Sequence, residues 1–538
     1  MALVSAGNLA SRPTSRVERA VTRCLPALVD LLFVCVLFAV LFGLGGRTLG
    51  DDGDAAWNLR IGSYILAHGI PRAEFMLSTT LGQPTVYWEW LSQTLYAVAL
   101  RLGGLNGVVA LAAVLVALTS ALLFAGMRRR AIPLALALPL ALVAIGLTSI
   151  TWTARAQLFS LLLTVLWSEC LWRYWCSGDR RLLWLFPPAM ALWVNLHGGF
   201  IAGLILLSVT AVVAWLFPTR RGLAEPRALT LALASSLAAT LVNPWGPGLI
   251  THIVSFFQNP LITRSIQEFQ SPDFHSLSMQ LFLAMVFGLV GVWIWLSRQS
   301  GTGGPEPLAL AHGAVWTALA LISVRFVPLW ALVVTPILGE SLVLCLRRWF
   351  SAAPAGQAAH TRLRGIAAAG AARFRNVEAT DRQASRGIWS ALALLWILAT
   401  VARGGAMPGM TAQALDARFD PTVFPVEAAQ RLHEVGVPPG RGFTTFSWGG
   451  YLDYALPEYH AFIDSRSDVY SQQLLQDYAA ITALAPGWQG LLDRYAVRWM
   501  LLPASEPLAQ LLALSPEWHC AAADTSAVAA LCLRGGAP

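Results

Sequence analysis

Residues 25–54 read LPALVDLLFVCVLFAVLFGLGGRTLGDDGD. The run 25–44 is almost entirely apolar, and its length is about what an α-helix needs to cross a bilayer. Three carboxylates, those of Asp51, Asp52 and Asp54, follow directly after it. Clustered carboxylates repel one another, hydrate strongly and are not needed there for folding. We therefore expect this stretch to hold the first membrane span and the beginning of a functional site.

The composition indicates a protein with many membrane spans. Of the 538 residues, 56% are hydrophobic and 12% are charged, whereas soluble proteins carry about 25% charged residues. Every basic residue is Arg, which matches the codon bias of a GC-rich bacterial genome, so the net charge of +8 is no sign of a nucleic-acid partner. The first apolar run is too long for a signal peptide, and no small-residue cleavage site follows it, so we expect an uncleaved span.

The arginines between the apolar runs predict the topology, because short cytoplasmic loops retain Arg. The runs lie at 25–46, 88–103, 105–126, 131–150, 156–175, 182–196, 199–217, 228–243, 277–297, 307–323, 326–346 and 388–403. Both the N-terminus and the loop 347–386 are rich in Arg and should be cytoplasmic, yet eleven runs separate them. One run must not cross, and 88–103 is short and carries Glu89 and Arg101. We expect it to be a juxtamembrane helix, which leaves eleven spans in a bacterial inner membrane.

The expected organisation is a polytopic α-helical membrane protein with a small C-terminal α/β domain in the periplasm. Its parts are a cytoplasmic Arg-rich N-terminus 1–24, a membrane domain 25–346 with external loops 47–104 and 244–276, a cytoplasmic loop 347–386, a last span 387–404, and the periplasmic domain 405–538.

The C-terminal domain shows alternating short elements and several Pro–Gly turns. We expect strands at 442–448, 461–463 and 497–502, helices at 472–484 and 487–495, and a hairpin of 518–524 with 528–533. Cys520 and Cys532 flank the turn of that hairpin. They could form a disulfide in an oxidising compartment, or be two small core residues.

In this topology, the unusual polar residues at the span ends fall on the external face. They are Asp51–Asp54, Arg155, Gln157, Asn195, His197, Asn243, Glu268, Gln270 and Arg325. Ionisable groups at membrane depth are costly and mark functional cavities. Their convergence predicts a single extracytoplasmic active site.

Apolar residues at helical spacing follow Asp54, and Gly69 with Pro71 should end that helix. We expect a short amphipathic helix lying on the membrane surface. Asp54 could serve as its N-cap or point into the site.

The segment Gly53-Asp54-Ala55-Ala56-Trp57-Asn58-Leu59-Arg60-Ile61-Gly62 resembles the first external loop of membrane glycosyltransferases of the GT-C type, and of a group of bacterial membrane proteins. Similar segments follow in the same order at 88–91, 155–160, 195–199, 243–246, 325–329, 447–452 and 462–470. Residues 447–452 also resemble an oligosaccharyltransferase acceptor motif but lack its Asp. Peptide-sequon recognition therefore does not carry over, and Trp448 and Tyr451 could simply pack in a core.

The resemblance implies a sugar transferred, with inversion, from a polyprenyl-phosphate donor to an acceptor hydroxyl on a glycan, lipid or protein. It places the acidic residue at Asp54, as general base. Residues expected to hold phosphate or sugar are Arg155, Arg325, Arg60, His197, Asn195, Gln157 and Glu268. Some enzymes of this type use a divalent cation (Mg²⁺ or Mn²⁺), which Asp52 and Asp54 could hold. Asp464 and Arg466 could be a structural ion pair.

Two other classes of function remain open. A transporter or flippase for a lipid-linked substrate could line its path with the same residues, although no inverted repeat is visible. A non-catalytic scaffold for envelope assembly could use the C-terminal domain to bind a partner.

Overall fold

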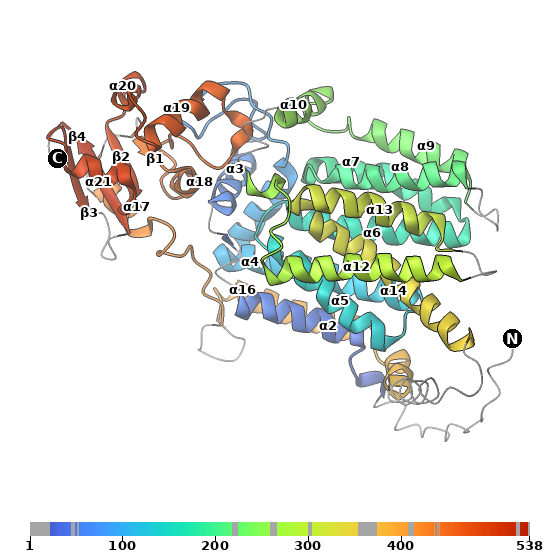
Figure 1. The fold of residues 1–538 in the computed structure, drawn as a ribbon. Coiled ribbons are helices and arrows are strands. Elements are labelled where there is room, and N and C mark those ends of the chain that lie inside the picture. The colour runs from blue at the N-terminus through green and yellow to red at the C-terminus, as the bar shows by residue number, and fades with distance from the viewer. Residues whose placement is uncertain are drawn as a thin grey trace.

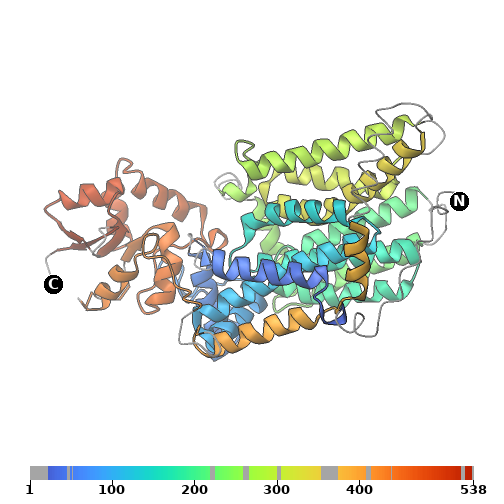
Figure 2. The same cartoon turned by 90° about the horizontal axis from the view of Figure 1, so that it is seen from below.

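The computed structural model describes residues 22–44, 49–50, 53–217, 224–258, 266–299, 304–352, 374–406, 414–434, 436–437, 439–440, 442–522 and 528–535. Most of these residues are helical. Figures 1 and 2 show long helices lying side by side in a bundle, with the C-terminal domain at one end of it.

The bundle is built from helices joined by short connections. They are α2 (Leu28–Phe38) with its continuation η1 (Ala39–Gly43), α4 (Trp90–Arg129), α5 (Leu134–Thr148), α6 (Gln157–Ser177), α7 (Phe186–Leu196), α8 (Phe200–Leu216), α9 (Pro226–Ala239), α12 (Leu277–Arg298), α13 (Pro307–Ile322), α14 (Val327–Ala352) and α16 (Ile388–Ala402). Helices α3 (Asp54–His68) and α10 (Pro247–Gln258) lie near the end that faces the C-terminal domain (Figure 1).

Several of these helices have the length and apolar character of membrane spans. Within the described residues, four are long and apolar enough to cross a membrane: Trp90–Arg129, Leu134–Thr151, Leu277–Arg298 and Val324–Phe350. Large apolar side chains such as Phe287 on α12 and Leu398 on α16 are exposed on the outside of the bundle, and soluble monomers rarely expose such surfaces over large areas. The protein is therefore compatible with a membrane location, and the number of eleven spans stays a prediction.

Helix α4 contains most of the apolar run 88–103 and all of the run 105–126, but a sharp bend divides it. Gly103 and Gly104 leave the helical conformation, and Gly104 has φ +59°. A Cβ on Gly107 would lie 2.2 Å from the carbonyl oxygen of Ala99, eight positions earlier in the chain. In a straight helix, eight residues span about 12 Å. The segment before Gly103 is thus a separate helical piece folded against the following one, and its place beside the membrane stays a prediction.

The C-terminal domain contains a four-stranded sheet in the order β1-β2-β4-β3. Its elements are α17 (Val426–Glu434), β1 (Gly442–Thr444), α18 (Phe446–Ala455), α19 (Gln472–Thr482), α20 (Trp488–Arg494), β2 (Trp499–Pro503), α21 (Pro507–Ala513), β3 (Trp518–Ala522) and β4 (Ala529–Arg534). The two predicted helices and the hairpin are confirmed, and the Cys520–Cys532 disulfide joins directly opposed residues of β3 and β4.

Two strand predictions in this domain are wrong. The strand expected over 442–448 ends at Thr444, and α18 begins at Phe446. Residues 461–463 form no strand, although Ile463 is buried. The glycines of α18 explain the first error, because a Cβ on Gly449 would lie 1.8 Å from the carbonyl oxygen of Ile463. The glycines let the backbone of α18 pack closely against its neighbour. This packing outweighs the strand propensity of the aromatic residues.

Helix α3 is enclosed between the bundle and the C-terminal domain. It packs against α4 on one side and α18 on the other, and its first residues, Ala55 and Ala56 among them, are buried. Gly53 (φ +77°) is its N-cap, and a Cβ there would lie 2.6 Å from the carbonyl oxygen of Ser447. The expectation of a helix with one face open to the membrane surface is therefore wrong for its N-terminal half, because α18 covers it.

Candidate functional site

A cavity of about 760 Å³ lies where α3 and the ends of several bundle helices meet the C-terminal domain. We call it the Asp54 cavity. The predicted site residues that line it are Asp54, Arg155, Gln157, His197, Glu268 and Arg325. The structure thus brings together six residues that are separated by up to 271 positions in the sequence.

Asp54 is the first residue of α3 and is held by partners from three parts of the chain. Its Oδ1 accepts hydrogen bonds from Trp57 Nε1 at 3.1 Å and from the hydroxyl of Ser465 in the C-terminal domain. Its Oδ2 forms an ion pair with Arg155 Nη1 at 3.1 Å. The alternative role as N-cap is wrong, since Gly53 takes that position and Asp54 is already the first residue of the helix.

Burial raises the pKa of Asp54 to about 7, against the opposing effect of the hydrogen bonds from Ser465 and Trp57. The positive charge of Arg155 at 3.1 Å favours the ionised form as well. A carboxyl group that titrates near neutral pH has the proton affinity that suits a general base.

Arg155, Glu268 and Arg325 form an open ion-pair network on one wall of the cavity. Glu268, in the short helix η5 (Gln267–Phe269), lies 3.3 Å from Arg155 Nη1 and 3.9 Å from Arg325 Nη1. Gln157 Nε2 also donates to this carboxylate, at 3.4 Å. The Glu268 side chain is 39% exposed. The Glu268 carboxylate thus already lies between the two guanidinium groups, and the same positive charges would attract a phosphate.

His197, which follows α7, has a defined tautomer. The Gly199 N–H donates to His197 Nδ1 at 3.0 Å, so Nδ1 is an acceptor. The Ser160 hydroxyl, which accepts from Trp193 Nε1, also donates to Nδ1 at 2.7 Å. The proton of the neutral ring is therefore on Nε2, so the Arg325 Nη2 contact with Nε2 at 3.5 Å is not a hydrogen bond in this tautomer. Burial and the nearby Arg325 lower the pKa of His197 well below its usual value, which keeps the ring neutral.

Glu89 is a site residue that the sequence analysis did not single out. It lines the Asp54 cavity, and its Oε1 lies 3.5 Å from His197 Nε2. Burial raises its pKa to about 8, with Arg325 acting in the opposite direction. The cavity therefore holds two acids whose pKa values lie near neutral pH. Such perturbed groups in a cleft are typical of functional sites.

Aromatic side chains form another part of the cavity wall. Trp88, Phe256 and Phe269 all line it. Phe256 lies 5.9 Å from Trp88 and 6.0 Å from Phe269 between ring centroids, and the Arg325 guanidinium lies 5.4 Å from the Phe269 centroid. Apolar rings beside charged groups suit a ligand with both an apolar part and an anionic part.

The C-terminal domain supplies Ser465, Arg466, Ser467 and Asp468 to the same cavity. Asp468 Oδ2 lies 3.1 Å from His252 Nε2 on α10, which ties this loop to the bundle. No charge pattern in the sequence distinguishes Ser465, which is 411 residues from Asp54 and was not predicted as a site residue.

Arg60 and Asn195 do not line the Asp54 cavity. The Arg60 guanidinium lies 5.6 Å from the Phe75 centroid. The Asn195 amide joins helices: it donates to the carbonyls of Ala191 and Val242 and accepts from Trp90 Nε1, each at 2.7 Å. Asn195 thus has a structural role.

The divalent-cation site expected at Asp52 and Asp54 stays a prediction, because only Asp54 lies in the described part of the chain. Asp51 and Asp52 lie outside those residues. Asp54 has the Arg155 guanidinium 3.1 Å from its carboxylate, where a metal ion would meet repulsion. No group of three or more His, Cys, Asp or Glu suited to a metal occurs among the residues described. We derive no step that depends on a metal.

In comparisons with known proteins, no family model and no curated protein matches the chain.

Proposed function

We propose that the protein is a membrane glycosyltransferase that moves a sugar from a polyprenyl-phosphate donor to an acceptor hydroxyl. The observation that carries this proposal is the place of Asp54: a carboxyl group with a pKa near 7 that shares one cavity with Arg155 and Arg325. The GT-C-type resemblance of the segment 53–62 supports the same reaction. An inner-membrane location with the site on the periplasmic side is part of the proposal.

The reaction assigns a role to each of these groups. The acceptor oxygen attacks the anomeric carbon, and its proton passes to the Asp54 carboxylate. The bond between that carbon and the phosphate oxygen breaks with inversion, and polyprenyl phosphate leaves with the electron pair. Arg155 and Arg325 stabilise the negative charge of the leaving phosphate. A base in this position contributes about 10²–10⁴-fold to the rate.

In the proposed reaction, Glu268 is an anion that the phosphate of the ligand replaces. Its distances of 3.3 and 3.9 Å to the two arginines are long for ion pairs. The leaving polyprenyl phosphate, which carries up to two negative charges, would bind the guanidinium groups more strongly and release Glu268. Glu89, with its pKa raised to about 8, is protonated at neutral pH and can donate a hydrogen bond to a phosphate or sugar oxygen.

The test compares Asp54→Asn with Asp416→Asn, a control in which an exposed carboxylate of the C-terminal region is changed. Each full-chain variant is given polyprenyl-phosphate sugars in bacterial membranes, which supply acceptor hydroxyls, and release of polyprenyl phosphate is measured. We expect Asp54→Asn to lower the release by about 10²–10⁴-fold and Asp416→Asn to leave it unchanged.

Equal turnover by wild type and Asp54→Asn would refute the base. Movement of the lipid-linked sugar across vesicles without glycosyl transfer would instead support a transporter.

A further inference from the structure

A second cavity, of about 340 Å³, lies inside the bundle away from the C-terminal domain. We call it the His312 cavity. Helix α6 reaches both cavities: Gln157 lines the first and Trp172 the second, and 15 residues of helix span about 22 Å. The two cavities are therefore separate sites near opposite ends of the same helix.

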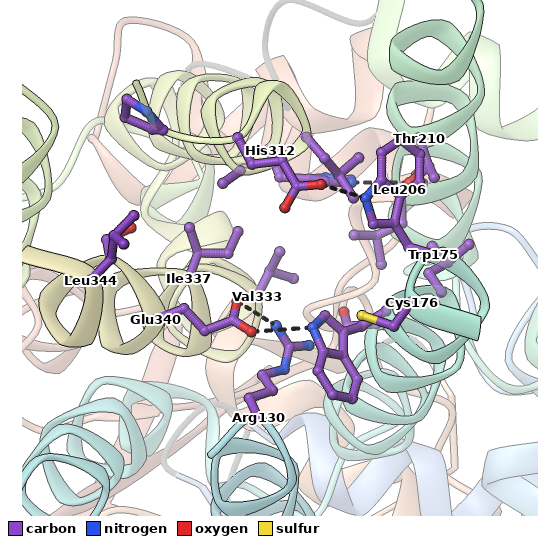
Figure 3. Close-up of a pocket in the computed structure, with 18 of the residues that line it drawn as sticks. Arg130, Trp175, Cys176, Leu206, Thr210, His312, Val333, Ile337, Glu340 and Leu344 are labelled. Carbon is purple, nitrogen blue, oxygen red and sulfur yellow. Dashed lines mark hydrogen bonds and ion pairs between the residues drawn. The ribbon is translucent and has the colours of Figure 1, made fainter. Parts of the chain in front are cut away.

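The walls of the His312 cavity are apolar, with a few polar groups facing one another across it. Figure 3 shows Arg130 and Glu340 on one side and His312 with Thr210 on another. The apolar residues include Leu206, Val333, Ile337 and Leu344. Small-molecule pockets have this character and begin at about 300 Å³.

His312 presents an acceptor that the protein does not use. Thr210 Oγ1 donates to the Leu206 carbonyl at 2.8 Å, so His312 Nε2 must donate in its 3.0 Å bond to Thr210 Oγ1. In a neutral ring this leaves Nδ1 as an acceptor. Nδ1 is buried and has no hydrogen-bond partner among the described residues, and His312 as a whole is 6% exposed. A buried acceptor without a donor is costly, and a ligand could supply the donor.

The charges in this cavity favour a cation. Arg130 and Glu340 form a pair at 3.5 Å, and the Arg130 guanidinium also lies 4.8 Å from the ring centroid of Trp172. Glu306 precedes α13 and is exposed at the edge of the cavity. Its carboxylate accepts a hydrogen bond from Trp175 Nε1 at 2.6 Å. With one guanidinium and two carboxylates, the lining carries a formal charge of −1.

We propose that the His312 cavity binds an organic ammonium group carried on an apolar chain. The ammonium N–H groups would donate to the Glu306 carboxylate and to His312 Nδ1. The chain would lie against the aliphatic side chains of α8 and α14. A free alkylamine and the amine headgroup of a phospholipid offer the same chemistry.

The test uses three probes with the same six-carbon chain: hexylammonium, 1-hexanol and hexanoate. Binding to the full-chain protein in a nonionic detergent is measured by calorimetry at pH 7. We expect hexylammonium to bind at least about tenfold more tightly than the other two, because a hydrogen bond to a charged group is worth that factor or more. Equal binding of 1-hexanol, or tighter binding of hexanoate, would overturn the proposal.

A matched pair of variants assigns the binding to this cavity. Glu306→Gln should weaken hexylammonium binding by about tenfold or more. Glu225→Gln is the control, since Glu225 also precedes a proline at the beginning of a helix, is paired with Arg180 and does not line the cavity. Unchanged binding by Glu306→Gln would contradict the assignment.

Competition identifies the source of the ammonium group. If phosphatidylethanolamine in mixed micelles displaces hexylammonium and phosphatidylglycerol does not, the ligand is a lipid headgroup. If neither lipid competes, the ligand is a free amine. Displacement by phosphatidylglycerol alone would mean that the cavity selects an anion and would refute the proposal.

Discussion

Two arginine–carboxylate networks lie next to each other at the junction of bundle and C-terminal domain, and they differ in how tightly they are closed. In the first, Arg466 bonds Asp464 at 2.7 Å and Glu74 at 3.0 Å, and none of the three side chains is more than 4% exposed. In the second, Arg155 and Arg325 share Glu268 at 3.3 and 3.9 Å, with Glu268 39% exposed.

The first network holds the domain in place, and the second can be rearranged by a ligand. Glu74 Oε1 also accepts from the backbone N–H groups of Phe75, Met76 and Leu77, so its loop depends on it. Glu268 has no comparable set of backbone partners among the described residues, and only side chains contact its carboxylate. The same residue types therefore serve stability in one place and binding in the other.

The largest effect is expected from Glu74→Gln. The amide keeps one oxygen for the backbone N–H groups but turns an N–H donor toward Arg466. Breaking one partner of a buried ion pair costs about 3–5 kcal/mol. The free energy of unfolding, measured by denaturant titration in detergent, should fall by that amount. A loss below about 1 kcal/mol, as is usual for surface sites, would show that the Arg466 network contributes little to stability.

Glu89→Gln should have the next largest effect, on the pH dependence of turnover. Asp54 must be ionised to accept a proton, so turnover should rise as pH increases through about 7. Glu89 must keep its proton to donate, so turnover should fall as pH increases through about 8. The variant should lose the alkaline limb and keep the acidic one, at a rate roughly tenfold lower. If both limbs persist, Glu89 is a structural acid.

Glu268→Gln is the matched partner of Glu74→Gln and should have the smallest effect. The free energy of unfolding should change by less than about 1 kcal/mol, because the side chain is partly exposed and its ion pairs are long. Removing the competing anion should tighten the binding of polyprenyl phosphate a few-fold, as measured by displacement of a labelled lipid phosphate. Weaker binding in this variant would mean that Glu268 holds the ligand directly.

The sequence predicted the residues at the span ends better than those in the C-terminal domain. Arg155, His197 and Arg325 could be grouped because charged residues near apolar runs must share an aqueous face. Ser465 carries no charge and lies in a loop, and only the fold brings it to Asp54. Glu89 was placed on a juxtamembrane helix without a role, because the bend at Gly103–Gly104 that orients that helix depends on tertiary contacts.

The most direct test of the account is a structure of the full chain with polyprenyl phosphate bound. We predict that the phosphate lies in the Asp54 cavity, with its oxygens within hydrogen-bond distance of Arg155 and Arg325 and with Glu268 displaced from between them. A phosphate bound at a place where neither guanidinium contacts it would contradict the proposed site.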